Sequence, residues 1–429
     1  MIKHIWTIIW NQRRSNGWIF MELLLVFAVL WIMMDSMLVS LVTYNRPLGF
    51  DITNVYSVKV GRLSPDMPGY LPDSLTKTSE GEDLVRLVDN IRRAPEVEEA
   101  SISYASCPYT WYTSWSPLVR ADADTSTNTG SDVDHSDYFQ RFLVTPSYFD
   151  VLRMKDNEGH PLRQEVERNE GVLVVSADME KKFFDGLSAK GQSLKWSAKS
   201  TNLLKIAAVS NPVRRDEFAM STPSYYELMR TDEDIVNMIS YAHAETANCL
   251  VRMKDGFKAE EMEPFLERMG EQLEVNNLYV SSVVSMEKFR AVFLKQSLDT
   301  LKKKCVLVGF MLVNVFFGII GTFWLRTQYR RGELGLRSAL GASRSVLERY
   351  LNVEGLSLLA FTVPLILIFI ANMLFFDLPD TYRLPYTWWR FLLTFGGSCL
   401  LLGGMIWSGI WFPARKIAKM NPADALHYE

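Results

Sequence analysis

Three long stretches of the sequence carry no charged residue, and they constrain the fold more than any other feature. These stretches are Cys305 to Leu325, Gly355 to Phe376 and Phe391 to Phe412. A helix needs about 20 mostly apolar residues to cross the hydrocarbon core of a bilayer, and each stretch is long enough. The sequence therefore predicts three membrane-spanning helices in its C-terminal part.

A fourth apolar stretch near the N-terminus, residues 18–42, contains the acids Glu22 and Asp35. A cleaved signal peptide is the alternative interpretation. Its apolar region would be only about 7–15 residues long, and a small-x-small cleavage site would follow it. The stretch is longer and no such site follows, so we interpret it as a true span. Glu22 is close enough to one end to reach the headgroups, whereas Asp35 lies deeper.

The short segments that flank these spans carry the basic residues that normally stay in the cytoplasm. Such residues precede the first span, fill the loop between the second and third, and follow the fourth: Lys3, Arg13, Arg14, Arg326, Arg330, Arg331, Arg337, Arg344, Arg349, Arg415, Lys416 and Lys419. Lys302, Lys303 and Lys304 would then lie outside, at the end of a long translocated domain where the charge rule has little force. Both ends of the chain are predicted to be cytoplasmic.

The predicted fold is a membrane protein with four transmembrane α-helices and a large α+β extracytoplasmic domain between the first and second spans. Its parts are a cytoplasmic interfacial helix (1–17), the first span (18–42), the extracytoplasmic domain (43–303), the second span (304–326), a cytoplasmic segment (327–350), the third span (351–376), a short outer loop (377–390), the fourth span (391–412) and a cytoplasmic tail (413–429).

The extracytoplasmic domain alternates between strand-like and helix-like patterns, which is typical of an α+β domain in one or two lobes. Strands are predicted at residues 51–60, 101–105, 171–176, 203–210 and 250–254, and helices at 82–93, 177–184 and 259–273. Residues 61–82, 121–137 and 155–170 have the composition of loops. Cys107 and Cys249 could form a disulfide in an exported domain, and the sequence leaves this open.

Several classes of function are excluded by what the sequence lacks. A net charge of −3 argues against a nucleic-acid partner. There is no G-x-x-x-x-G-K-[ST], G-x-S-x-G or H-E-x-x-H motif, so we expect no ATPase or other catalytic centre and no cofactor site on this chain. The cluster Asp132, Asp134, His135 and Asp137 is interpreted as a solvated acidic loop rather than a metal site.

The cytoplasmic segment between the second and third spans is the most informative part of the sequence. Glu333 and Arg337 stand four apart and can pair across one helical turn. Leu334, Leu336 and Leu340 offer an apolar surface. Gly341 and Ala342 should break the helix, and Ser343 can cap the next one. Such a helix could transmit force to whatever it binds; the alternative is an arginine-rich loop that only sets topology.

This segment resembles the cytoplasmic signature of the MacB and FtsX-like ABC permeases. The matching run is R-x-x-E-L-G-L-R-x-A-L-G-A-S-R, from Arg330 to Arg344. The ending P-A-R-K…N-P-A-D-A-L-x-Y-E, from Pro413 to Glu429, is similar to the family's C-terminal signature. Residues 61–80 and 111–137 depart from the family pattern.

The resemblance implies a permease subunit that lies in a bacterial cytoplasmic (inner) membrane and works with a separate ATP-binding subunit, which would bind the ATP. It implies a second permease copy or paralogue as a dimer partner, and a periplasmic adaptor or target on the outer side. It assigns the coupling to one set of residues: Arg331, Glu333, Gly335, Arg337, Leu340, Gly341 and Ala342. The alternative function is a membrane-anchored sensor or scaffold without an ATPase partner.

Within the spans, the polar residues Asp35, Asn314, Glu354 and Asn372 need an explanation. The last three are interpreted as polar links between helices or as interfacial residues. Asp35 is the best candidate for a cargo contact or proton site, because an acid inside a span is functional by default. Small residues allow helices to pack closely, and this role is expected of seven glycines: Gly309, Gly318, Gly321, the pair Gly396 and Gly403, and their neighbours at 397 and 404.

Overall fold

The computed structural model describes residues 13–72, 74–121, 138–184, 187–197, 200–329, 332–333, 336–337 and 340–418. The chain divides into two compact units. The helical unit consists of Met1–Asn45 and Ser297–Glu429, and the sheet domain is Arg46–Gln296. The predicted interfacial helix, up to residue 12, and the tail from residue 419 lie outside the described residues.

Four helices are long and apolar enough to cross a membrane: Gly17–Tyr44, Met286–Tyr329, Ser345–Phe375 and Trp388–Trp411. They belong to α2 (Arg13–Tyr44), α9 (Met286–Tyr329), α11 (Arg344–Phe375) and the consecutive helices α12 (Trp388–Phe391), η6 (Leu392–Gly396) and α13 (Gly397–Ala418). The sheet domain falls between the first and second of them. The predicted fold class, four spans with a large domain inserted after the first, is confirmed.

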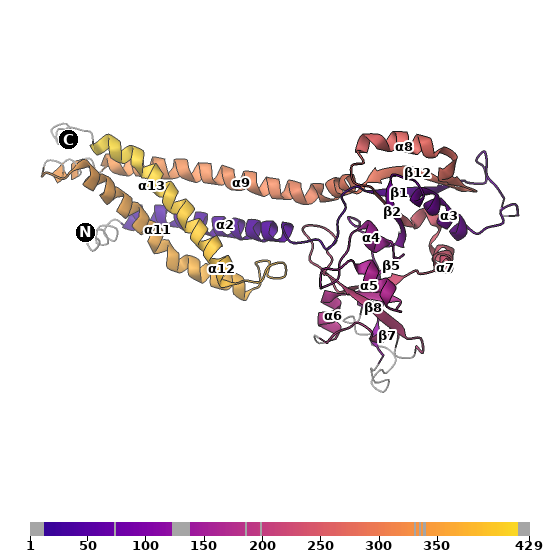
Figure 1. Cartoon of the computed structure of the whole chain (residues 1–429). Helices are drawn as coiled ribbons and strands as arrows, with labels where there is room; N and C mark the ends of the chain where they lie inside the picture. The colour runs from indigo at the N-terminus through magenta and orange to yellow at the C-terminus, as the bar shows by residue number, and fades with distance from the viewer. Residues whose placement is uncertain are drawn as a thin grey trace. The chain divides into compact units, whose positions relative to one another are not determined.

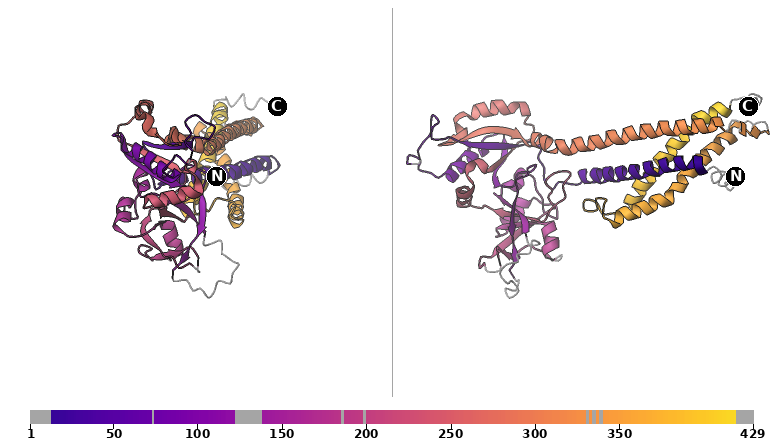
Figure 2. Two further views of the ribbon diagram at one scale, coloured as in Figure 1. Left: turned by 90° about the vertical axis from the view of Figure 1, so that its right-hand side faces the viewer. Right: turned by 180° about the vertical axis from the view of Figure 1, so that it is seen from behind.

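Helices α2, α11 and α13 form the core of the helical unit, and the views in Figures 1 and 2 show them alongside one another. Phe27 of α2, Ile366 of α11 and Ile406 of α13 have no exposed surface. Helix α9 adds only Val308, Val315 and Ile319 to this buried cluster. Most of its other large apolar side chains are exposed in the single chain, so they face lipid or a partner.

Four glycines permit close helix packing, and they differ in part from the predicted ones. A Cβ on Gly318 would lie 2.9 Å from the Glu22 carboxylate, and one on Gly397 would lie 3.3 Å from Met34. Gly403 faces Leu356 of α11, and Gly409 faces Ile319 of α9. The expectation is wrong for the remaining glycines, because nothing among the described residues lies within 4 Å of a Cβ built on Gly309, Gly321, Gly396 or Gly404.

Helix α9 begins well before the predicted span. It has 44 residues, which corresponds to about 66 Å at 1.5 Å per residue, whereas the hydrocarbon core is about 30 Å thick. Its first residues, up to Gln296, belong to the sheet domain. The sequence places the span at 304 because the charged residues Lys295, Asp299 and Lys302 precede the apolar run; they are compatible with a helix, but not with its immersion in lipid.

The sheet domain is built on one mixed sheet with the strand order β11-β12-β1-β10-β2-β5-β9-β6-β8-β7-β4, with β3 paired to β5. Its strands are β1 (Val55–Arg62), β2 (Val97–Tyr104), β3 (Ser114–Pro117), β4 (Val119–Arg120), β5 (Tyr138–Val144), β6 (Leu173–Ser176), β7 (Ser193–Lys195), β8 (Leu204–Ser210), β9 (Ser224–Leu228), β10 (Asn248–Met253), β11 (Glu274–Val275) and β12 (Leu278–Ser285). The pairs β5–β9 and β6–β8 are parallel and the other pairs are antiparallel.

Helices cover the sheet and enclose three apolar clusters. They are α3 (Glu80–Arg92), α4 (Tyr148–Val151), α5 (Leu162–Arg168), α6 (Ala177–Phe183), α7 (Asp232–Ala242) and α8 (Met262–Met269), with short 3-10 turns η3 (Ala244–Thr246), η4 (Ala259–Glu261) and η5 (Gly270–Leu273). Helices α3, α7 and α8 pack on β1, β2 and β10 (Figure 1). Helices α4 and α5 share a second cluster with β9, and α6 a third with β6 and β8.

The predicted strands and helices of this domain are present, with ends shifted by a few residues. One predicted loop is wrong in part, because residues 155–170 contain α5. Leu162 and Val166 are fully buried four residues apart, and the polar residues around them hid this short apolar pattern. The sequence also gave no sign of β12 or of the parallel partners β5 and β9, whose pairing joins distant segments.

All four cysteines are free thiols, which resolves the open question about Cys107 and Cys249. Cys249 points into the cluster under α3, and Cys107 packs against the cluster under α4. Burial raises the pKa of each thiol to about 12. Both therefore serve as small apolar side chains.

Candidate functional site

The cytoplasmic segment is held together by the ion pair that its spacing predicts. Arg337 Nη2 donates to Glu333 Oε1 at 2.6 Å. The Arg337 guanidinium also lies 4.3 Å from the ring centre of Tyr350, a buried residue of α11. Arg337 thus connects the segment to the third span by a cation–π contact as well as pairing within its own turn. Tyr350 is part of this site, although no motif in the sequence predicted it.

Two leucines of the segment face outward. Leu336 is 51% exposed and Leu340 is 79% exposed, and residues four apart lie on the same side of a helix. A pair of exposed leucines beside a connecting turn is the kind of surface that a partner protein buries. The segment therefore has an inner side, formed by Glu333 and Arg337, and an outer side, formed by Leu336 and Leu340.

The turn that follows has the predicted glycine break. Gly341 has a φ of +94°, which side-chain-bearing residues rarely adopt, and the N–H of Ala342 donates to the Arg337 carbonyl. Ser343 occupies the N-cap position of α11, but its side chain makes no capping hydrogen bond. It lies 3.1 Å from the Ser345 hydroxyl instead. The predicted side-chain cap is therefore wrong, although the helix starts where expected.

Some residues of the predicted sites lie outside the part of the chain that the structure describes. Arg331 and Gly335 of the cytoplasmic segment lie outside the described residues. So do the C-terminal signature from residue 419 and the acidic cluster Asp132, Asp134, His135 and Asp137.

Asp35 is paired inside the helical unit with an arginine that the sequence did not suggest. Arg390 Nε donates to Asp35 Oδ1 at 2.8 Å and Arg390 Nη2 donates to Oδ2 at 2.6 Å. Arg390 has no exposed surface and Asp35 is 4% exposed. Two parallel charge-assisted bonds are the strongest geometry available to these groups. Arg390 Nη1 also donates to the carbonyls of Asp380 and Leu384.

The backbone around this ion pair is unusual. Residues Leu392–Gly396, directly after α12, form a π-helical turn, a rare conformation that is often found at functional sites. Within it, Thr394 accepts a hydrogen bond from Trp31 Nε1 at 3.2 Å and donates to the Arg390 carbonyl at 2.8 Å. Trp31 and Asp35 lie one turn apart on α2, so one face of α2 makes both contacts with the start of the fourth span.

The outer loop supports Arg390 from the other side. Asp380 receives the backbone N–H of Arg383 at 2.9 Å and pairs with its guanidinium. Burial raises the pKa of Asp380, but these hydrogen bonds and the attraction of Arg383 and Arg390 outweigh it, so the pKa is lowered overall. Asp380 therefore stays ionised beside the buried pair.

One signal in the sequence could have identified Arg390. Arg383 and Arg390 lie in the predicted outer loop, against the usual distribution of basic residues. An acid in one span and an arginine at the edge of another are expected to pair, because each alone is costly in a membrane. The sequence does not say which spans are neighbours, so the pairing became visible only in the fold.

The other polar residues of the spans behave differently from one another. Asn314 and Asn372 are exposed and donate to carbonyls of their own helices, those of Phe310 and Ile368, each at 2.8 Å. Of the two interpretations of these asparagines, the link between neighbouring helices is therefore wrong within this chain, and the interfacial position stays a prediction. Glu354 is 1% exposed and has an interaction partner. Lys304 of α9 donates to the Ser36 hydroxyl of α2 at 2.7 Å, next to the Asp35 contact.

The part of the chain that the structure describes contains one group of three potential metal ligands, Asp156, Glu158 and His160. Asp156 Oδ1 accepts the backbone N–H groups of Glu158 and His160, at 2.9 and 2.8 Å. These bonds close a tight turn and account for the buried carboxylate, while the other two side chains are exposed.

Three solved structures are similar to this chain. A domain of a protein described as a permease, from Porphyromonas gingivalis, is 15% identical with a TM-score of 0.33, over 55% of this chain and 92% of that one. The periplasmic region of MacB from Actinobacillus actinomycetemcomitans is 13% identical with a TM-score of 0.33, over 58% and 94%. The extracellular domain of the noncanonic ABC-type transporter YknZ from Gram-positive bacteria is 12% identical with a TM-score of 0.28, over 53% and 100%.

No family model matches the sequence, and no curated protein matches it. At 12–15% identity the three similarities concern the fold alone. What the chain does has to be argued from its own residues.

Proposed function

We propose that this chain is the permease subunit of an ABC transporter of the MacB/FtsX type. It works with a separate ATP-binding subunit, pairs with a second permease copy or paralogue, and lies in a bacterial inner membrane. ATP hydrolysis by the partner moves the sheet domain, either to export a substrate or to act on a periplasmic adaptor or target.

The observation that carries this proposal is the construction of the cytoplasmic segment. It combines a matching signature, an ion pair stacked on α11 through Tyr350, and two exposed leucines. A docking surface that is connected to a span can transmit the movement of a bound partner to that span. A loop that only sets topology needs neither the stacked ion pair of Glu333 and Arg337 nor the exposed leucines. Helix α9 runs without interruption from Met286 to Tyr329, directly before this segment, and contributes residues to both units.

The test is to replace both outward leucines with serine, Leu336→Ser with Leu340→Ser, in the full chain. The permease is reconstituted with an ATP-binding subunit that co-purifies with the unaltered chain, and binding and ATPase stimulation are measured. Burying two leucines contributes about 3 kcal/mol, so the affinity should fall about 100-fold. The matched control replaces Leu187 and Leu203, which are also more than half exposed but lie on the sheet domain, with serine.

A second variant, Glu333→Gln with Arg337→Gln, removes the ion pair between these two residues while keeping both leucines. It should lower ATPase stimulation without changing the melting of the sheet domain. Unchanged stimulation in both double variants would overturn the coupling assignment. Failure of any ATP-binding subunit to associate with the unaltered chain would favour the sensor or scaffold instead.

A further inference from the structure

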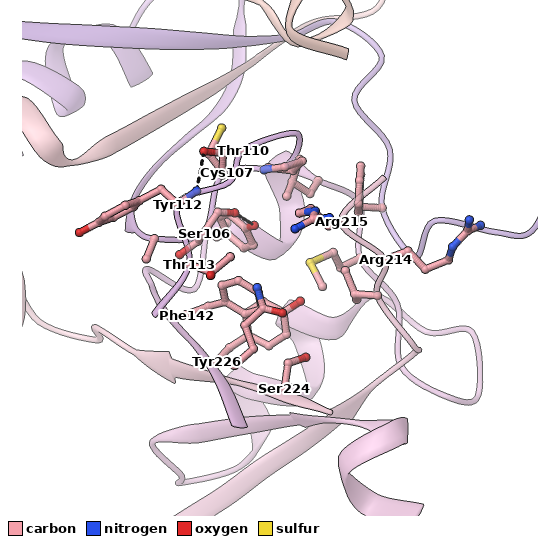
Figure 3. Close-up of a pocket in the computed structure, with 18 residues that line it drawn as sticks. Ser106, Cys107, Thr110, Tyr112, Thr113, Phe142, Arg214, Arg215, Ser224 and Tyr226 are labelled. Atoms are coloured by element: carbon pink, nitrogen blue, oxygen red, sulfur yellow. Dashed lines mark hydrogen bonds between the residues drawn. The ribbon is translucent and has the colours of Figure 1, made fainter. Parts of the chain in front are cut away.

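The pocket over strands β5 and β9 of the sheet domain is filled by its own side chains. Figure 3 shows Phe142 and Tyr226 close together on one side of it, and their rings stack with centres 5.0 Å apart. Tyr226 is buried, and the cavity has a volume of only about 40 Å³, whereas small-molecule sites typically have ~300–1,000 Å³. This pocket has room for a few water molecules only.

The helical unit carries a surface that the proposed function does not use. Three consecutive lysines, Lys302, Lys303 and Lys304, come directly before the uncharged run that begins at Cys305. All four residues belong to α9 and to the helical unit. Basic side chains at such a boundary reach the depth of the lipid phosphates. The expected topology places them on the outer side of the membrane, where basic residues are usually rare.

The three ammonium groups have different surroundings. Lys304 Nζ donates to the Ser36 hydroxyl of α2 at 2.7 Å, so this lysine faces the other helices. Lys302 is exposed and its Nζ lies 3.5 Å from Asp299 Oδ1, a surface ion pair of a kind that contributes little. The Lys303 ammonium is exposed and has no ion pair or hydrogen bond among the residues that the structure describes. Lys302 and Lys303 are therefore available to an anion.

An exposed apolar stripe of α9 continues from Lys303 along the same side of the helix. Residues three, four and seven positions apart share one side of a helix, and the residues at these spacings after Lys303 are Val306, Leu307 and Phe310. They are 72%, 51% and 67% exposed. The stripe extends to Phe317, which is exposed as well. A basic group at the end of an apolar stripe matches a phospholipid, which joins a phosphate to acyl chains.

The same side of the helix has space for a chain and little negative charge. Gly309 follows Lys302 by seven positions, and no described residue lies within 4 Å of a Cβ built on it. An acyl chain can therefore approach the backbone there. No acidic residue follows Asp299 in the rest of α9. Asp35, next to the serine that Lys304 contacts, is already bonded to Arg390. The charge that this surface presents is positive.

We propose that this side of α9 binds an anionic phospholipid, with the phosphate on Lys302 and Lys303 and an acyl chain along Val306, Leu307 and Phe310. A zwitterionic lipid has the same phosphate, but the lysines repel its amine, so the site selects a headgroup with a net negative charge. The attraction is electrostatic and weakens as salt is added. The site does not depend on the proposed ATP-binding partner, so either assignment can fail without the other.

The experiment uses the full chain in nanodiscs of mixed phosphatidylcholine and phosphatidylglycerol. The lipids that stay with the protein after mild detergent extraction are counted by native mass spectrometry. We expect phosphatidylglycerol to be enriched about threefold or more over its share of the bilayer. Lys302→Gln with Lys303→Gln should remove most of this enrichment. The matched control, Lys288→Gln with Lys295→Gln, removes the same charge from exposed positions of α9 in the sheet domain and should leave the enrichment unchanged.

Photocrosslinking of the unaltered chain with a diazirine-labelled phosphatidylglycerol keeps the test independent of how the variants fold. Adducts on residues 302–317 support the site if unlabelled phosphatidylglycerol suppresses them and phosphatidylcholine does not. Equal enrichment of the two lipids, unchanged enrichment in the folded Lys302→Gln, Lys303→Gln protein, or adducts confined to other segments would overturn it.

A second copy of the chain is the competing occupant of this surface. Cys305 is exposed and follows Lys302 by three positions, so the two lie on the same side of the helix. A short bifunctional thiol reagent that joins Cys305 of two copies in nanodiscs would show that protein rather than lipid covers this side, and would overturn the proposal. Cys305 that reacts without joining two copies supports it.

Discussion

Asp35 and Arg390 show how a single residue pair can organise a membrane unit. Each would be expensive to bury alone, and each removes the cost of the other through two short hydrogen bonds. The carboxylate of Asp35 is committed to this pair, so its first role is to join α2 to the start of the fourth span. A role in transport or proton movement stays a prediction, and it would require the pair to open.

Replacing one member of the pair should be more harmful than replacing both. Asp35→Asn or Arg390→Gln alone leaves an uncompensated buried charge, which typically costs about 3–5 kcal/mol. The double variant should recover part of that loss, and thermal melting of the detergent-solubilised protein by tryptophan fluorescence would rank the three. Arg268→Gln is the control, because that exposed pair with Glu96 should contribute at most about 1 kcal/mol. Single variants that melt at the same temperature as the control would contradict a stabilising role for the buried pair.

Among the elements of the sheet domain, β10 is a central strand that joins distant segments. It pairs with β1 on one side and β2 on the other. Its Arg252 is 1% exposed and donates to the carbonyls of Val151, Thr53 and Asp51, each at 2.7 Å. One side chain from a central strand therefore satisfies the backbone at the end of α4 and before β1, where regular pairing stops.

Arg252→Met should loosen this domain. The substitution keeps the apolar stem but leaves three carbonyls without a donor, at about 1 kcal/mol or more each. We expect the backbone amides of β1 and β10 to exchange hydrogen faster in the variant than in the unaltered full chain. The increase should correspond to a loss of about 3 kcal/mol in the free energy of opening. Arg153→Met is the matched control, because Arg153 is 42% exposed and makes only surface ion pairs. Equal exchange in the two variants would show that the carbonyl contacts contribute little.

At the scale of the whole molecule, the sheet domain lies between the first and second of the four helices that are long and apolar enough to cross a membrane. The cytoplasmic segment lies between the second and third of them, so the expected topology puts it and the sheet domain on opposite sides of the membrane. Under the proposed function, an ATP-dependent partner would act on one side and the sheet domain would respond on the other.

Cysteine labelling tests this orientation directly. In a chain whose four native cysteines are replaced, Ser282→Cys on the exposed edge of β12 should react with a membrane-impermeant maleimide in intact cells. Ser345→Cys at the exposed start of α11 should react only after the cells are made permeable. Labelling of Ser345→Cys from outside would reverse the topology and remove the basis for an ATP-driven partner at this segment.

Much of the fold was predictable because its signals are local. Uncharged runs of the right length located the spans, alternating apolar residues located most strands, and the spacing of Glu333 and Arg337 was enough to predict their ion pair. Helix α5 was missed because two buried residues make too weak a pattern among polar neighbours. The stacking of Arg337 on Tyr350 was missed because a glycine turn separates the two residues, and its geometry decides where the segment points.

The sequence by itself determined how many times the chain crosses the membrane, where the inserted domain lies, and which segment carries the permease-like signature. Hydropathy and periodicity are properties of consecutive residues, so the chain reveals them directly. Tertiary structure alone decided that Asp35 meets Arg390, 355 positions away, and that Trp111, Arg215 and Phe293 stack on one another. Such contacts depend on which helices and strands become neighbours, and that is settled by packing of the whole chain rather than by any stretch of it.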